Sequence, residues 1–147
     1  MPVCLAAGAL LVALPAEAFS LSWTHSVEKT VWSEDWRVAG QTLVLDEARV
    51  SGSGAGMEPP AGARLQDGTW RYRPLLGPLQ RLRLAHSEFA SDYSLCWRDN
   101  CELLATLVDH ERAAVEVFPC GANEPWSTAG GGAAPQAAGA GAREVTR

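Results

Sequence analysis

The chain lacks a surplus of positive charge, and it has no basic residue before Lys29. Its 147 residues carry 12 basic and 17 acidic side chains, which gives a net charge of −5. Non-specific binding to nucleic acid depends on Lys and Arg side chains that neutralise phosphates. The composition therefore argues against a nucleic-acid partner. No run of like charge forms a polybasic or polyacidic interaction tail either.

Sequence motifs of nucleotide, cofactor and metal sites are also missing. The glycine run "GSGAGM" at 52–57 has no Gly-Lys-Ser/Thr and no GxGxxG that opens a helix, so it does not match a phosphate-binding loop. No Ser-His-Asp order or metal motif is present. We therefore expect no cofactor. The glycine run is either a turn over the mouth of a pocket or, more simply, a connecting loop.

No apolar run reaches the ~20 residues that a transmembrane helix needs. The apolar stretch from Val3 to Leu14 is followed by "PAEA" at 15–18, which fits the small-x-small pattern of a signal-peptide cleavage site. We predict that residues 1–18 are a signal peptide, although its positive n-region is missing. The protein would then be periplasmic or otherwise extracytoplasmic, either dissolved there or associated with the membrane. The alternative is that these residues form a buried N-terminal segment of the domain.

Cysteine spacing agrees with export. The sequence "CWRDNC" separates Cys96 and Cys101 by a turn-like pair, and a two-residue hairpin turn would bring the two residues within disulfide distance. As a metal site the pair is a weak pattern, because no second pair or histidine lies nearby. Removal of residues 1–18 would take Cys4 away and leave Cys120 odd. Cys120 would then be free, form an intermolecular bridge, or displace one member of the predicted pair.

Alternation of apolar and polar residues is the main pattern in the rest of the chain. It predicts strands over 19–27 and 32–40, a third strand after a Gly-Gln turn, and shorter strands in "TWRYR", "LRLAHS", "DYSLCW" and "VEVF". An apolar stripe at helical spacing predicts one helix over 102–114. We expect an all-β fold: a small antiparallel β-sandwich or barrel of about seven short strands, with one short helix near the C-terminal end.

This fold would occupy residues 19–120 as a single β-rich domain. Residues 121–147 are rich in Gly, Ala and Pro and lack aliphatic periodicity. Such a composition cannot bury enough apolar surface to fold, so we predict a disordered tail.

The segment "WTHSVEKTVWSEDW" at 23–36 predicts a β-hairpin with charged groups on its aromatic face. Antiparallel pairing that matches both apolar faces gives these opposite pairs: Leu21–Val38, Trp23–Trp36, His25–Glu34 and Val27–Trp32. Directly opposed side chains have Cβ atoms ~5 Å apart, which allows contact between an imidazole and a carboxylate.

A type II′ turn at Gly40-Gln41 would bring Glu47 into line with Glu34. It would also pair Val38 with Leu43 and Trp36 with Leu45. His25, Glu34 and Glu47 would then lie across three strands. The cluster could be structural, with Arg49 neutralising the acids. It could also bind a ligand or a metal ion, or serve a metal-assisted hydrolase.

Five arginines and one acid lie between residues 59 and 83. Arg71 and Arg73 project from one predicted strand, and Arg81 and Arg83 from another. If the strands are neighbours, the four form one outer surface for an acidic protein or for weak contact with anionic lipid headgroups. The simpler interpretation is a solvated face.

The segments "HSVEKT", "WSEDW", "GSGAGMEPP" and "DYSLC…C" together resemble a family of small exported bacterial proteins of unknown function. The resemblance covers roughly residues 19–104. Members of that family are often encoded beside TRAP transporters of the TAXI type, which take up organic acids. The motif positions, together with Glu47 from the predicted strand alignment, give these ligand-binding candidates: His25, Ser26, Glu28, Lys29, Glu34, Glu47, Gly54 and Gly56.

What the resemblance implies is a non-enzymatic periplasmic accessory or binding module linked to TRAP-type solute uptake. Its partner would be a transporter subunit or an organic-acid ligand. No catalytic residue can be carried over from the family. The competing hypothesis is the metal-assisted hydrolase that uses His25, Glu34 and Glu47.

Overall fold

The computed structural model describes most of the chain up to residue 121. The described residues are 2–24, 30–51, 62–85, 92–108 and 114–121. No helix among them is long and apolar enough to cross a membrane.

The described residues form strands and one short helix. In chain order the elements are β1 (Val3–Ala7), β2 (Leu10–Leu14), β3 (Ala18–Thr24), β4 (Val31–Ala39), β5 (Thr42–Ser51), β6 (Arg64–Gln66), β7 (Thr69–Tyr72), β8 (Leu82–Leu84), β9 (Ser94–Trp97), β10 (Asn100–Leu103), α1 (Leu104–Leu107) and β11 (Val115–Pro119).

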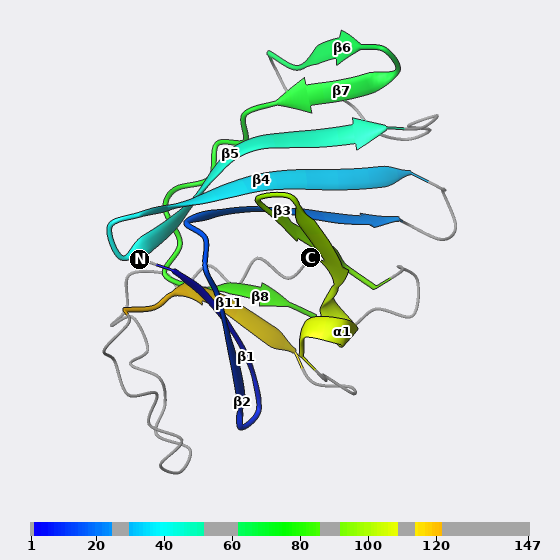
Figure 1. Cartoon of the computed structure of the whole chain (residues 1–147). Coiled ribbons are helices and arrows are strands. Elements are labelled where there is room, and N and C mark those ends of the chain that lie inside the picture. Colours follow the sequence, from blue (N-terminus) through cyan, green and yellow to red (C-terminus); the bar gives the residue numbers. More distant parts are fainter. Residues whose placement is uncertain (1, 25–29, 52–61, 86–91, 109–113, 122–147) are drawn as a thin grey trace.

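The strands build two antiparallel sheets (Figure 1). One has four strands in the order β2-β1-β11-β8, and the other has seven in the order β10-β9-β3-β4-β5-β7-β6. Neither sheet closes into a barrel in the described part of the chain. The predicted all-β fold with one short helix near the C-terminal end is therefore confirmed as the two-sheet form. The prediction of about seven strands missed four, namely β1, β2, β6 and β10.

The main core lies between the two sheets. It receives alternate side chains from both, including Leu5 of β1, Leu21 of β3, Trp36 of β4 and Val117 of β11, all at most 1% exposed. Leu104 of α1 packs into the same cluster. Burial of each such side chain contributes ~1.5–3 kcal/mol, so this layer supplies most of the driving force for folding.

The N-terminal segment forms part of the core in the structure. All five residues of β1 are buried, and β1 lies between β2 and β11 in the four-stranded sheet. Cys4 of β1 forms a disulfide with Cys120, whose Cα is 5.8 Å away. This arrangement is the alternative of a buried N-terminal segment. Cleavage after Ala18 stays a prediction, and it would remove β1, β2 and Cys4.

Two tight turns follow the sequence signals. Gly40 has a φ of +61° while Gln41 does not have a positive φ, which matches the predicted type II′ turn. Asp67 and Gly68 both have a positive φ, which is the type I′ pattern favoured by Asp-Gly. The second turn joins β6 to β7 and fixes Gln66 opposite Thr69.

The predicted pairing of β3 with β4 is wrong. The observed register is displaced by two residues on each strand, so the residue opposite a given position differs by four from the predicted one. Trp23 pairs with Trp32, Phe19 with Trp36, and Leu21 with Glu34. The observed pairing stacks Trp23 on Trp32 at 6.2 Å and Phe19 on Trp36 at 6.5 Å between ring centroids. Aromatic pairs across strands stabilise a sheet. The observed register has two of them, and the predicted one had only Trp23 with Trp36.

The pairing of β4 with β5 follows the prediction only up to a β-bulge. Trp36 pairs with Leu45 and Val38 with Leu43, as expected, but the register shifts between Asp35 and Trp36. Beyond the shift Glu47 pairs with Asp35, and Glu34 pairs with Ala48. A bulge adds one residue to one strand and reverses which face the following side chains occupy. The predicted alignment of Glu34 with Glu47 is therefore wrong.

The C-terminal elements are partly as predicted. Cys96 and Cys101 face each other across the β9–β10 hairpin with Cα atoms 4.1 Å apart, and their predicted disulfide is confirmed. The predicted helix over 102–114 begins later, because β10 extends to Leu103 and α1 covers Leu104–Leu107. Residues 109–113 lie outside the described residues.

The two arginine-bearing strands are not neighbours. β7 belongs to the seven-stranded sheet, whereas β8 pairs with β11 in the other sheet. Arg81 lies over the ring of Phe118, 4.5 Å from its centroid, and pairs with Glu116. The condition for a single surface of four arginines, that these strands are neighbours, is therefore not met.

Candidate functional site

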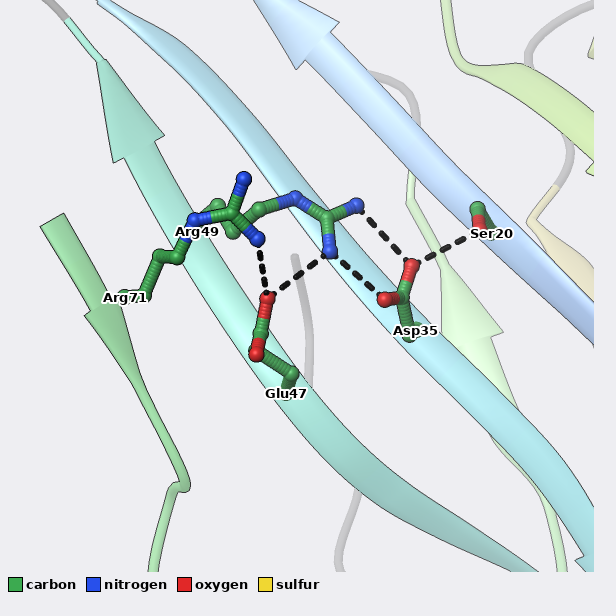
Figure 2. Close-up of polar contacts among 5 residues, drawn as sticks. All are labelled: Ser20, Asp35, Glu47, Arg49 and Arg71. Atoms are coloured by element: carbon green, nitrogen blue, oxygen red, sulfur yellow. Dashed lines mark hydrogen bonds and ion pairs between the residues drawn. The ribbon is translucent and has the colours of Figure 1, made fainter. Parts of the chain in front are cut away.

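The outer face of the seven-stranded sheet, on the side away from the main core, carries a network of charged side chains. β3, β4, β5 and β7 contribute Ser20, Asp35, Glu47, Arg49 and Arg71 (Figure 2). Polar side chains alternate with core residues along these strands, so the period of two places them together on one face. The bulge in β5 moves Glu47 onto this face.

Arg49 is the centre of the network. Its guanidinium donates two hydrogen bonds to the Asp35 carboxylate, at 2.6 and 2.9 Å, which is the bidentate geometry that favours arginine. It also donates to Glu47 Oε1 at 3.1 Å. Arg71 donates to the same oxygen at 3.0 Å, and the Ser20 hydroxyl donates to Asp35 at 2.7 Å.

These contacts hold Asp35 and Arg49 in their charged forms. The Arg49 hydrogen bonds lower the pKa of Asp35 below its usual 3.8, and the Ser20 hydroxyl adds to this effect, while partial burial opposes both. The hydrogen bond to Asp35 raises the pKa of Arg49. Groups charged at every physiological pH are suited to electrostatic binding rather than to proton transfer near pH 7.

Three arginines follow one another across the edge of this sheet. Arg49 pairs with Arg71 across β5 and β7, and Arg71 pairs with Arg64 across β7 and β6. We call Arg49, Arg71 and Arg64 the arginine row. Directly opposed cross-strand side chains share a face, and like charges in such positions repel each other. Two carboxylates, Asp35 and Glu47, contact the row, so one guanidinium is in excess.

The excess lies at Arg64, on the edge strand. Arg64 is exposed and pairs with no carboxylate among the described residues. The Arg71 side chain is 44% exposed and uses one nitrogen on Glu47. The row continues inward as hydroxyl side chains, since Ser33 pairs with Arg49, Ser22 with Ser33, and Ser94 with Ser22. The face therefore offers guanidinium and hydroxyl donors, which suit oxyanions.

The structure separates the acids of the predicted cluster. Glu34 is 3% exposed and shares a strand face with Trp36, whereas Glu47 belongs to the charged network on the opposite face. Glu34 and Glu47 therefore cannot form one ligand set. The predicted line of His25, Glu34 and Glu47 across three strands is wrong, because its two acids lie on opposite faces. Six further candidates lie outside the described residues: His25, Ser26, Glu28, Lys29, Gly54 and Gly56.

Sequence reasoning missed Asp35, Ser20, Arg71 and Arg64 as members of one network. A signal for the bulge was present, because the apolar positions of β5 change from odd to even numbers between Leu45 and Ala48. Reading that change would have placed Glu47 and Arg49 on the face of Asp35. The alternative in which Arg49 neutralises the predicted acids holds for Glu47, while its other carboxylate partner is Asp35 and not Glu34.

No group of three or more His, Cys, Asp or Glu side chains within the described ranges is arranged to hold a metal ion.

A family described as a domain of unknown function, DUF1850, matches residues 19–104. No curated protein and no solved structure matches the chain. The matched region begins within β3, ends at the start of α1, and includes the whole charged network.

Proposed function

The chain belongs to the DUF1850 family, and on that premise we propose that it is an exported, non-enzymatic binding module. Its role would be to assist a TRAP-type solute transporter by contacting a transport protein. The observation that carries the proposal is the arginine row: Arg71 and Arg64 are exposed, and Arg49 and Arg71 are held in place by hydrogen bonds to Asp35 and Glu47.

Two disulfides support the extracytoplasmic part of the proposal. Cys96–Cys101 closes the β9–β10 hairpin, and Cys4–Cys120 joins residues 116 positions apart. Disulfides persist in oxidising compartments such as the periplasm and are rare in the cytosol. The Cys96–Cys101 bond would remain after cleavage behind Ala18, and the Cys4–Cys120 bond requires that residues 1–18 are kept; either bond suits a place outside the cytoplasm.

The arrangement of the charged network supports binding over chemistry. Catalysis by general acid and base needs a group that exchanges protons near the working pH. Asp35 has a lowered pKa and Arg49 a raised one, so both keep their charge. Fixed charges on an open sheet face are suited to selecting a partner of opposite charge.

The link to TRAP-type uptake rests on the family resemblance and is association rather than chemistry. Affinity purification of the chain from native membrane and periplasmic fractions tests it. We expect a transport protein to be recovered with the unaltered chain. Repeated recovery of the chain without a partner, or its recovery with reduced cysteines from the cytosol, would contradict the proposal.

N-terminal sequencing of the same purified chain shows whether residues 1–18 are removed. N-terminal sequencing that begins near Phe19 would establish cleavage after Ala18, with loss of Cys4 and β1. Sequencing that begins before Cys4 would establish that the core strand is retained.

A further inference from the structure

The geometry points to a docking edge: we propose that β6 receives an extended acidic segment of a partner protein, which adds as a further strand and places carboxylates against Arg64 and Arg71. The inference rests on the proposed binding function and names the chemistry of the partner. It follows from three features of the edge: its open backbone, its charge and its exposed leucine.

Among the residues that the structure describes, β6 has a neighbouring strand on one side only. β6 is the last strand of the seven-stranded sheet, at the top of Figure 1 and far from the four-stranded sheet. All three of its residues are exposed. A two-residue turn makes Gln66 and Thr69 a hydrogen-bonded pair, so the next pair, Leu65 and Trp70, is not hydrogen-bonded. The N–H and C=O of Leu65 therefore point away from β7, toward the open edge.

Side chains on the two faces of β6 differ in character. Arg64 continues the arginine row on the outer face, whereas Leu65 lies on the other face and is 59% exposed. A strand added beside β6 would hydrogen-bond to Leu65 through one residue, whose side chain lies on the leucine face. The residues before and after it would lie on the arginine face. The segment that fits is acidic–apolar–acidic.

Charge selects this occupant over a second copy of the chain. The arginine row holds three guanidinium groups against two carboxylates, so a further carboxylate beside Arg64 completes the pairing. A second β6 placed against the first would bring another Arg64 to a face that already has an excess of positive charge. In that pairing Arg64 would lie opposite Gln66 of the second copy and diagonal to its Arg64, so the copy would add positive charge and supply no carboxylate, which disfavours self-association at this edge.

A binding titration tests the inference. The probe is a fluorescein-labelled peptide of seven residues that alternates Glu and Val, and the readout is its anisotropy with the full, oxidised chain at low salt. We expect saturable binding that weakens in 0.5 M salt. Arg64→Gln and Arg71→Gln should each weaken binding about tenfold, the loss of one charged contact. Leu65→Ser should weaken it several-fold through lost apolar contact.

Matched controls separate strand addition from simple charge attraction. Arg98→Gln removes an arginine at the opposite edge of the same sheet, in the β9–β10 turn, and should leave binding unchanged. A peptide with Pro in place of its central Val lacks the N–H that bonds the edge and should not bind. A peptide that alternates Lys and Val should not bind either.

Several outcomes would overturn the inference. They are equal binding of the Lys–Val peptide, full binding of the Pro peptide, and undiminished binding by Arg64→Gln. Binding of citrate or phosphate without binding of the Glu–Val peptide would assign the row to a small anion instead. Failure of every probe to bind would also reject it.

The proposed function can fail or stand separately. If a transport protein co-purifies with Arg64→Gln as well as with the unaltered chain, the binding role stands and the β6 edge alone is rejected.

Discussion

The Asp35–Arg49 pair shows how one bidentate contact organises a whole sheet face. Asp35 accepts two hydrogen bonds from Arg49 and one from Ser20, while Arg49 also reaches Glu47. Both side chains are only partly exposed, so solvent screens the pair less than a fully exposed one. The network therefore fixes the position of Arg49, the inner member of the arginine row, next to the exposed members Arg71 and Arg64.

The lowered pKa of Asp35 predicts a pH-dependent contribution to stability. A carboxyl whose pKa is depressed in the folded state stabilises the fold above its unfolded pKa, and this contribution is lost as the pH falls through the folded pKa. Asp35→Asn should lower the free energy of unfolding at pH 7 by about 1 kcal/mol. The difference between variant and unaltered chain should shrink below about pH 4.

Urea denaturation at several pH values measures this contribution. Asp99→Asn, in the exposed β9–β10 turn, serves as the control and should have little effect at either pH. A difference for Asp35→Asn that stays constant from pH 7 to pH 3 would show that its effect does not come from the carboxylate charge.

At the residue scale the sequence indicated which charged residues could interact, but most contacts of the charged network could not be predicted from it. The sequence left open that Arg49 neutralises Glu34 and Glu47, and the network contains its contact with Glu47 alone of the two. It assigned Glu47 to the wrong face, because alternation was extended through "LDEA" without regard to the apolar Ala48 and Val50 that follow. One inserted residue is enough to invert a strand, since the side-chain period is two.

At the scale of elements, the bulge in β5 lets one strand serve two requirements. Before it, Leu43 and Leu45 face the core; after it, Ala48 and Val50 do. Asp46 and Glu47 between them both face outward, where Asp46 pairs with Arg37 and Glu47 with the arginines. The bulge thus supplies two adjacent outward acids without breaking the core.

Deletion of single residues tests the position of the bulge. Removal of Asp46 should restore regular alternation and keep Ala48 and Val50 inside, at a cost of about 1 kcal/mol from the lost pair with Arg37. Removal of Val44 should force either Leu45 out of the core or Asp46 into it, which costs ~2–5 kcal/mol.

Thermal denaturation of the two deletion variants compares them directly. Equal destabilisation by the two deletions would mean that β5 has no bulge at Asp46-Glu47.

Strand positions were predicted well, and strand pairing was predicted less well. Alternation located β3, β4, β7 and β9 within a few residues. The register of β3 on β4 depends on which aromatic rings meet, and the predicted turn at Lys29-Thr30 carries no favoured turn residues in the sequence that could have fixed it. The β4–β5 turn at Gly40-Gln41 does carry such a residue, and pairing beside it was predicted correctly.

At the scale of the whole molecule, disulfides tie the two ends of the chain together. Cys4 lies in the buried strand β1, and its partner Cys120 follows β11, the strand beside it. The sequence could not indicate this bond, because residues 3–14 have the length and apolar character of a leader. In the structure only residues 3–7 form a strand that is buried on both faces, whereas β2 is largely exposed.

The two disulfides should contribute unequally to stability. Loop-closure entropy assigns ~5 kcal/mol to the long loop of Cys4–Cys120 and ~2 kcal/mol to the short hairpin loop of Cys96–Cys101. The Cys4→Ser/Cys120→Ser variant should therefore lose more stability than Cys96→Ser/Cys101→Ser in equilibrium urea denaturation. The comparison applies to the chain that keeps residues 1–18, and an equal or reversed order would contradict the placement of β1 in that fold.

The central claim is that the chain recognises a transport protein through the β6 edge, and in-cell photo-crosslinking at Leu65 tests it most directly. A photoreactive amino acid at Leu65 should form an adduct with one transport protein, and Arg64→Gln in the same chain should reduce that adduct. The same photoreactive residue at Leu103, exposed on the opposite edge strand β10, is the control and should form none. No adduct at Leu65 in an extracytoplasmic fraction that contains the chain, or equal adducts at both positions, would contradict the claim.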